Sequence, residues 1–223
     1  MLNPVPTHYD YDPPTDPWIN IVHEEADFVV VDKPSGLLSV PGKDPALADS
    51  LQRRAEGHWP TAGMIHRLDK DTSGVMVLAF DKRSHAKIAM QFEKRTATKS
   101  YVARVWGLLE ADEGIVDLPI AVDWENKPRQ RIDFERGREA RTQWRVISRE
   151  DGVTRVRLFP LTGRTHQLRL HMMTLGHPVL GDQFYATGDA FAAADRLQLH
   201  AEELSFAHPV TDEPVHFVIP TPF

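Results

Sequence analysis

Residues 66–80 read HRLDKDTSGVMVLAF, and this stretch decides the fold. Residues 74–80 form a continuous apolar run of strand length, which predicts a buried β-strand. The five ionisable side chains just before the run would lie in a loop, where a rigid strand can present them to a ligand. A solvated turn, capped by Asp69 and with Lys70 and Asp71 paired in water, explains the same residues, so the spacing leaves both possibilities open.

A second polar cluster occupies residues 161–171, LTGRTHQLRLH. Arg164 is expected where a strand passes into a helix, and His166 lies about one helical turn before Arg169. An arginine near a helix N-terminus suits the oxygens of a carboxylate or a phosphate. An amphipathic helix whose arginine and histidine side chains only face water would have the same pattern.

Strand and helix patterns alternate irregularly along the rest of the chain. Expected strands cover 28–32, 101–106, 140–148, 154–159, 198–206 and 215–219, and expected helices cover 46–56, 83–95 and 165–175. The dipeptide Asp151-Gly152 predicts a hairpin turn between two of the strands. Since no internal repeat is visible, this order predicts an α+β fold with a mixed, mostly antiparallel sheet flanked by helices and loops.

The charge of the chain is polarised. The formal net charge is −6, yet residues 61–107 carry nine Lys or Arg against four Asp or Glu, and residues 127–171 carry twelve against five. These two basic segments therefore hold a net +12, and the rest of the chain holds −18. The acidic total is thus no argument against a nucleic-acid partner.

Length suits one domain, and we expect residues 18–223 to form it as two subdomains that share one sheet. Residues 1–17 contain five prolines and no Lys or Arg, which is typical of an extended, acidic tail. No apolar run approaches the length of a membrane span and the first residues lack a signal-peptide pattern, so a cytoplasmic protein is expected.

The composition also limits the chemistry. With no cysteine there is no disulfide, thiolate nucleophile or Cys-based zinc site. The histidines form no HExxH, and no glycine-rich phosphate loop is present, so we expect neither a metal nor a cofactor. A glycoside hydrolase using Asp69 and Asp71 is disfavoured, because both carboxylates would sit on one loop and no sugar-stacking aromatic cluster is evident.

Four stretches resemble the RluA-type RNA pseudouridine synthases, in the same order. They are DKPSGLLSVPG at 32–42, HRLDKDTSG at 66–74, KSYVARVWG at 99–107 and LTGRTHQLRLHMMTLGHPVLGDQFY at 161–185. The resemblance runs from about Trp18 onward and implies a pseudouridine synthase-like fold. It also implies a cofactor-free isomerase that converts uridine to pseudouridine in RNA.

Within that family the short chain, without an S4-like RNA-binding domain, most resembles the dual-specificity branch. Members of this branch modify a tRNA anticodon stem-loop and a 23S rRNA hairpin, so RNA stem-loops are the expected partners of a monomeric enzyme. An rRNA-only synthase of the same family and a non-catalytic RNA-binding or ribosome-assembly protein stay as alternatives.

The resemblance also implies the catalytic residues. Asp69 matches the family's essential aspartate, which serves the cleavage of the N-glycosidic bond by attack at C1′, attack at C6 or removal of the C2′ proton. Arg164 matches the arginine that pairs with this aspartate, and its charge survives at any working pH. Tyr101 matches the active-site tyrosine, with a face that stacks on uracil and a hydroxyl suited to proton transfer at C5.

Five further residues are implied to bind RNA. Arg67 matches the arginine that fills the space left by the flipped nucleotide, and Leu168 would pack beneath the base. His66, Lys33 and Arg169 complete the expected set, although Lys33 and Pro34 also match the first family motif, for which an architectural role is expected. If the resemblance holds, both basic segments meet in one cleft around Asp69 and the acidic remainder faces away.

Overall fold

The computed structural model describes residues 2, 4, 5 and 11–223, which divide into two units. The unit containing Asp69, called here the Asp69 unit, comprises the described residues 11–99 and 200–222. The unit containing Arg164, called the Arg164 unit, comprises the described residues 2, 4, 5, 100–199 and 223. Both boundaries between 99 and 100 and between 199 and 200 fall inside strands, so the chain passes from one unit to the other along extended backbone.

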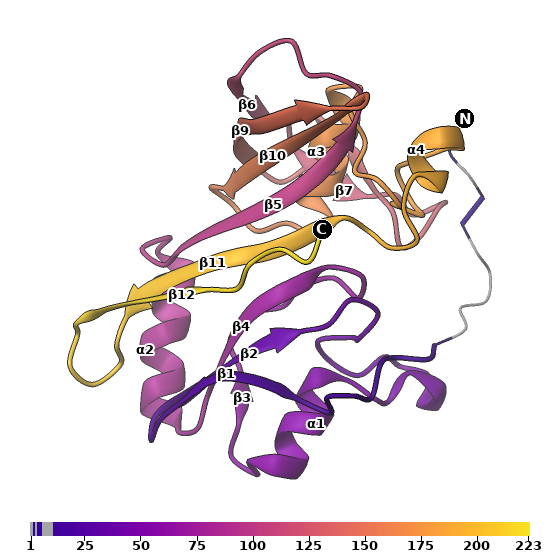
Figure 1. The fold of residues 1–223 in the computed structure, drawn as a ribbon. Helices are drawn as coiled ribbons and strands as arrows, with labels where there is room; N and C mark the ends of the chain where they lie inside the picture. Colours follow the sequence, from indigo (N-terminus) through magenta and orange to yellow (C-terminus); the bar gives the residue numbers. More distant parts are fainter. Residues whose placement is uncertain (1, 3, 6–10) are drawn as a thin grey trace. The chain divides into compact units, whose positions relative to one another are not determined.

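The Asp69 unit contains six strands and two α-helices among its described residues, shown largely in indigo, violet and yellow in Figure 1. They are β1 (Asn20–Glu24), β2 (Phe28–Lys33), the 3-10 turn Pro45–Leu47, α1 (Leu51–His58), β3 (Gly63–Met64), β4 (Ser73–Ala79), α2 (Lys82–Glu93), β11 (Leu199–Ala207) and β12 (Pro214–Val218). The strand order is β1, β2, β4, β11 and β12, and β3 also pairs with β4. Only the β4–β11 pair is parallel within the described part of this unit.

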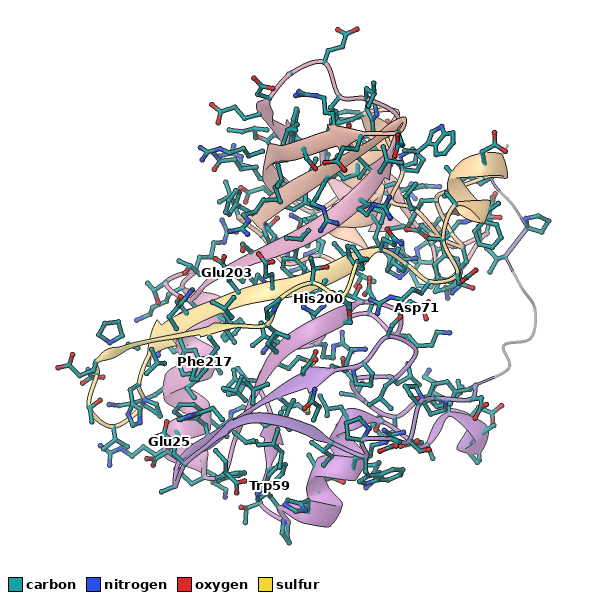
Figure 2. The ribbon with its side chains drawn as sticks, viewed as in Figure 1. Glu25, Trp59, Asp71, His200, Glu203 and Phe217 are labelled. Atoms are coloured by element: carbon teal, nitrogen blue, oxygen red, sulfur yellow. The ribbon has the colours of Figure 1, made fainter. Side chains whose placement is uncertain are left out.

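The core of the Asp69 unit forms where β2 and β4 pair. Residues 28–31 and 75–79 are almost completely buried, as expected for continuous apolar strands that are covered on both faces. Phe28 makes an edge-to-face contact with Phe206 on β11 and another with Phe217 on β12 (Figure 2). Helix α2 packs on β4, and its Ile88 is fully buried. The loop before β4 therefore emerges from the most rigid part of the unit.

The Arg164 unit is built on a meander. Its elements are β5 (Thr98–Trp106), β6 (Glu113–Asp117), β7 (Ile120–Val122), β8 (Gln130–Ile132), β9 (Arg141–Glu150), β10 (Val153–Pro160), α3 (Gln167–Thr174) and α4 (Gly188–Ala192). The antiparallel order is β5, β10, β9 and β6, and β7 pairs with β8. Ile120, Ala140, Leu170, Phe184 and Tyr185 form a buried cluster.

Most of the predicted elements are confirmed, including the α+β class with its mostly antiparallel pairing. The hairpin turn has φ of 52° at Asp151 and 75° at Gly152, the positive values that a two-residue type I′ turn requires. The helix predicted over 46–56 is wrong at its start. The helix begins instead after Ser50, whose hydroxyl accepts a hydrogen bond from the Arg53 amide, and a short 3-10 turn precedes it.

The N-terminal segment is more firmly attached than its proline content suggests. The Tyr11 hydroxyl donates to the Asp49 carbonyl at 2.8 Å and accepts from the Leu38 amide at 2.9 Å. Arg54 donates to the Pro14 carbonyl at 2.8 Å. The described chain is thus held to the Asp69 unit from Tyr11 on, earlier than the start near Trp18 that the composition suggested. Residues 1, 3 and 6–10 of the expected tail lie outside the described residues.

No helix in the described part of the chain is both long and apolar enough to cross a lipid bilayer.

Candidate active site

Asp69 lies in the loop that leads into β4, partly buried between an exposed Arg67 and a buried Leu68. The Asp69 carbonyl accepts a hydrogen bond from the Thr72 amide at 3.2 Å, which closes a tight turn. Figure 2 labels Asp71, the next acidic residue of this loop, just before β4 begins. The turn therefore holds the backbone of Asp69 in one conformation next to a buried strand.

A second loop, residues 34–39 after β2, clamps the backbone on both sides of Asp69. The Ser39 hydroxyl donates to the Leu68 carbonyl at 2.7 Å and accepts from the Leu68 amide at 3.1 Å. The Gly36 amide donates to the Lys70 carbonyl at 2.9 Å. The Ser35 hydroxyl donates to the Asp71 carbonyl at 2.7 Å. These four bonds explain why KPSGLLS accompanies HRLDKD, because the first motif fixes the backbone of the second.

Lys33 ties both loops together from inside the unit. Its side chain is completely buried, and its ammonium donates to the carbonyls of Pro34 at 2.8 Å, Leu37 at 2.7 Å and Lys70 at 2.9 Å. An ammonium has three donors, and each has a protein acceptor here. The expectation that Lys33 binds RNA is therefore wrong: the buried ammonium is an architectural part of the Asp69 loop.

Replacing Lys33 with methionine is expected to lower the free energy of unfolding by about 3 kcal/mol, because one buried and two partly buried carbonyl oxygens would lose their donor. The rate of catalysis should fall as well, since the Asp69 loop loses its connection to β2. Urea unfolding and single-turnover kinetics measure the two effects. The exposed Lys43, changed to methionine, provides the control. Equal stability of the two variants would contradict the role given to Lys33.

His66 faces the interior of the Asp69 unit. Its Nε2 accepts a hydrogen bond from the Val77 amide at 3.1 Å, and its ring stacks on Phe92 with centroids 4.6 Å apart. Burial, together with the positive charge of Lys99, lowers the pKa of His66 to about 3. A neutral imidazole that accepts a hydrogen bond from β4 is suited to a structural role, and the RNA-binding role expected for the partly buried His66 stays a prediction.

The low pKa of His66 predicts a pH dependence of stability. The unfolded chain takes up a proton near the ordinary value of 6.5, whereas the folded chain does so only near 3. The unfolded state therefore binds more protons between these values, and stability falls as the pH drops from about 6.5 toward 3. Urea midpoints at pH 7 and pH 5 measure this loss. A His66→Gln variant should lose less stability over that interval, and an identical loss would contradict the assignment.

The beginning of β4 is fixed to the C-terminal strands of the same unit. The hydroxyl of Ser73 is 2.8 Å from Nδ1 of His200, and Nε2 of His200 is 2.9 Å from the Ile219 carbonyl (Figure 2). Gly74 has φ of 118°, and a side chain there would collide with the Ala201 carbonyl oxygen. The last residues of HRLDKDTSG thus serve the packing of β4 against β11.

In the Arg164 unit, Arg164 lies between β10 and α3, and a glutamine holds its loop. The Arg164 amide donates to Oε1 of Gln167 at 3.0 Å, and Nε of Arg164 donates to the Glu139 carbonyl at 2.9 Å. The same Oε1 accepts from the Thr162 hydroxyl at 2.7 Å, and Nε2 of Gln167 donates to the Arg141 carbonyl at 2.9 Å. The strand-to-helix junction expected for Arg164 is confirmed.

Arg169 does not face solvent. It is 1% exposed and forms a bidentate ion pair with Asp182, with both N–O distances at 2.7 Å. Burial raises the pKa of Asp182, but the charge and hydrogen bonds of Arg169 outweigh it, so this pKa lies below its ordinary value. The expectation that Arg169 binds RNA is therefore wrong, because Asp182 occupies its guanidinium fork.

The remaining predicted residues of this unit lie on its regular elements. Tyr101 is a largely buried residue of β5 and pairs in register with Leu158 of β10. Leu168 is buried in the first turn of α3. His166 precedes that helix with a left-handed φ of 55°, and its Nδ1 is 2.9 Å from the Tyr185 hydroxyl. The contact between His166 and Tyr185 therefore also fixes the start of α3, next to the hydrogen bonds of Gln167.

Three positioning residues were missed from sequence alone: Ser39, Gln167 and Asp182. Each lies inside a quoted motif, but its role depends on partners that are 13 to 29 residues away in the chain. The sequence signal that could have indicated Asp182 is the turn dipeptide Gly181-Asp182. In the structure Gly181 has φ of 70° and lies against the backbone of Arg196, so only glycine fits there. Oδ1 of Asp182 also accepts hydrogen bonds from the backbone amides of Phe184 and Tyr185.

The two units thus supply different chemistry. The Asp69 unit offers a carboxylate on a clamped loop next to an exposed guanidinium, and the Arg164 unit offers an arginine and a tyrosine on fixed backbone. No group of three or more potential metal ligands occurs among residues 2, 4, 5 and 11–223. A carboxylate held in this way can stabilise positive charge that develops at a sugar carbon or can act as a nucleophile there.

Known proteins match this chain over most of its length. The model of the RNA pseudouridylate synthase family matches residues 27–174. The dual-specificity RNA pseudouridine synthase RluA of Pasteurella multocida is 51% identical over 214 residues, which cover 96% of this chain and 98% of that protein. The Escherichia coli K12 protein of the same name is 46% identical over 215 residues, with the same coverage.

A solved structure agrees with the sequence relatives. Human RNA pseudouridylate synthase domain containing 1 superposes with a TM-score of 0.76 at 31% identity and covers 92% of this chain and 84% of that one. The expected pseudouridine synthase-like fold is thereby confirmed. The chain belongs to the RNA pseudouridylate synthase family, whose members are isomerases that convert uridine to pseudouridine in RNA.

Proposed function

We propose that this protein is a dual-specificity enzyme that forms pseudouridine in a tRNA anticodon stem-loop and in a 23S rRNA hairpin. The observation that carries the proposal is the clamped Asp69 loop, together with relatives named dual-specificity RNA pseudouridine synthase RluA that are 46–51% identical over most of the chain. We also propose that the enzyme acts in the cytoplasm, where tRNA and rRNA are found, and that it acts as a monomer.

Asp69 is proposed as the catalytic carboxylate. Breaking the N-glycosidic bond develops positive charge at C1′, which a nearby carboxylate stabilises or captures, as in retaining glycosidases. After the bond breaks, uracil turns and rejoins the ribose through C5. The clamp from Ser35, Gly36 and Ser39 supports this role, because catalysis by a carboxylate requires its position to be maintained within fractions of an ångström.

Arg164 and Tyr101 are proposed to act on the same uridine. Arg164 would keep the aspartate ionised through the charge and planar fork of its guanidinium. Tyr101 would stack on uracil and assist proton transfer at C5, and Leu168 would pack beneath the base. The fixed backbone of these three residues supports the roles, since Gln167 holds the Arg164 loop and β10 holds Tyr101 in register.

Arg67 is proposed as the residue that occupies the place of the flipped uridine. Unstacking a base costs a few kcal/mol, and a planar guanidinium inserted into the stack offsets part of it. Its exposure and its position two residues before Asp69 support this role. Lysines and arginines of both basic segments would add phosphate contacts, and the loop of the hairpin would be read by its shape and by splayed bases.

The proposal is tested by incubating the purified protein with unmodified tRNA anticodon stem-loops and 23S rRNA hairpins and mapping pseudouridine. The expected result is conversion of a defined uridine in at least one RNA of each class. Conversion of rRNA alone would favour the rRNA-only alternative. Salt-dependent RNA binding without any pseudouridine would favour the non-catalytic protein.

A further inference from the structure

Lys99, at the beginning of β5, is a partly buried lysine without a counter-charge in the Asp69 unit. Its Nζ lies 5.9 Å from the centroid of the Phe92 ring. The structure gives Lys99 no ion pair with a carboxylate and no side-chain hydrogen bond, so far as residues 2, 4, 5 and 11–223 are concerned. This distinguishes it from Lys33, Lys70 and Lys87, each of which has oxygen partners in the same unit.

The surroundings of Lys99 make an unpaired cation costly. The ring of His66 stacks on Phe92 with centroids 4.6 Å apart, and an imidazole, which is either neutral or positively charged, cannot supply a counter-charge to Lys99. Burial alone lowers the pKa of Lys99, and no acidic group opposes the shift. A cation that is taken out of water without a partner costs free energy that a bound anion would restore.

Lys99 is only partly buried, so its side chain is not sealed from solvent. Nζ of Lys99 is not among the polar atoms that are sealed from solvent without a hydrogen bond, which in the described chain are the hydroxyls of Ser100 and Thr221. The cation–π contact with Phe92, at 5.9 Å, restrains the side chain of this partly buried residue. The site also belongs to the Asp69 loop, since the histidine stacked on Phe92 is three residues before Asp69.

We propose that Lys99 binds a backbone phosphate of the substrate RNA beside the Asp69 loop, on the platform formed by Phe92 and His66. The inference rests on the proposed function and adds a phosphate-binding residue to it. Phosphate is the anion that every RNA strand presents, and lysine is suited to it as a point charge. The arriving phosphate would supply the counter-charge that the protein lacks at this position.

The test compares Lys99→Met with wild type for RNA affinity, salt dependence and thermal stability. An Asp69→Asn background allows binding to be measured without turnover. We expect the Kd for the stem-loop to rise about tenfold or more, and the slope of log affinity against log salt to become shallower by about 0.7 to 0.9. The melting temperature should stay equal or rise, because an unpaired charge has been removed. Lys99→Arg should retain most of the affinity.

Lys43→Met is the control, because Lys43 is exposed and lies outside both basic segments, and its salt slope should not change. An unchanged Kd and slope for Lys99→Met, in a protein whose wild type forms pseudouridine, would overturn the inference and leave the proposed function standing. A loss confined to kcat, with the same Kd and slope, would also overturn it and indicate proton transfer. Absence of pseudouridine with the wild type would instead refute the proposed function.

Discussion

Replacing Asp69 with asparagine is expected to slow pseudouridine formation by about 10⁴-fold or more, while RNA affinity stays within a few-fold of wild type. Asparagine keeps the shape of the side chain but removes the charge and the nucleophilic oxygen. The backbone clamp from residues 34–39 does not use the Asp69 side chain, so the loop should keep its structure. Single-turnover kinetics with saturating enzyme separate the chemical step from binding.

Asp71→Asn is the control for this change. Asp71 lies on the same loop, carries the same charge and pairs with Lys70 at 3.2 Å. Its loss should alter the rate much less than that of Asp69, because no catalytic step is assigned to it. Similar rates for both variants, or rapid turnover by Asp69→Asn, would show that the catalytic carboxylate is not Asp69.

The largest expected effect on stability is that of Asp182→Ala, about 5 kcal/mol in the free energy of unfolding. The change leaves the guanidinium of Arg169 buried without its carboxylate, which costs about 3–5 kcal/mol, and removes the acceptor of the Phe184 and Tyr185 amides. Urea unfolding of wild type and variant measures the difference. If the variant does not fold, the milder Asp182→Asn provides the comparison.

A second substitution, at Arg169, tests whether the buried charge causes this loss of stability. The double variant Arg169→Met, Asp182→Ala should be more stable than Asp182→Ala alone, because no charge remains buried. Additive effects of the two substitutions on the free energy of unfolding would contradict the buried pair.

The ion pair also makes stability depend on pH. Since the folded pKa of Asp182 is below its ordinary value of 3.8, the stabilisation is complete above that value and is lost as the pH falls through the lower folded value.

Local sequence rules were sufficient where an element depends on its own residues. Sequence alone identified the strands β2 and β4 and the turn at Asp151-Gly152. In each case consecutive residues determine the burial of the strand or the geometry of the turn. Strand β1 could not be identified in this way, since all five of its residues are exposed and no alternation marks them. Ser50 is a different case, because a serine at a helix start is a visible capping signal that was not used.

The direction of polar side chains was harder to predict. Lys33 and Arg169 were expected to bind RNA, and both side chains are buried, whereas His66 is partly buried and accepts a hydrogen bond from β4. Their partners are far along the chain, such as the Lys70 carbonyl for Lys33 and Asp182 for Arg169. A motif gives the type of residue at each position, but it does not show whether that side chain contacts the ligand or supports the loop that binds the ligand. Arg67 and Asp69 stay as proposed, because Arg67 is exposed and Asp69 is only partly buried in a fixed loop.

The parallel pairing of β4 with β11 has a consequence for the order of synthesis on the ribosome. His200 and Ala201 abut Ser73 and Gly74, yet they are made more than 120 residues later. During translation, the loop that carries Asp69 can receive its clamp from residues 34–39 early, while the strand behind it lacks a neighbour until residues 199–218 emerge. Nascent chains that end before residue 199 should therefore be inactive, even when their first hundred residues have folded.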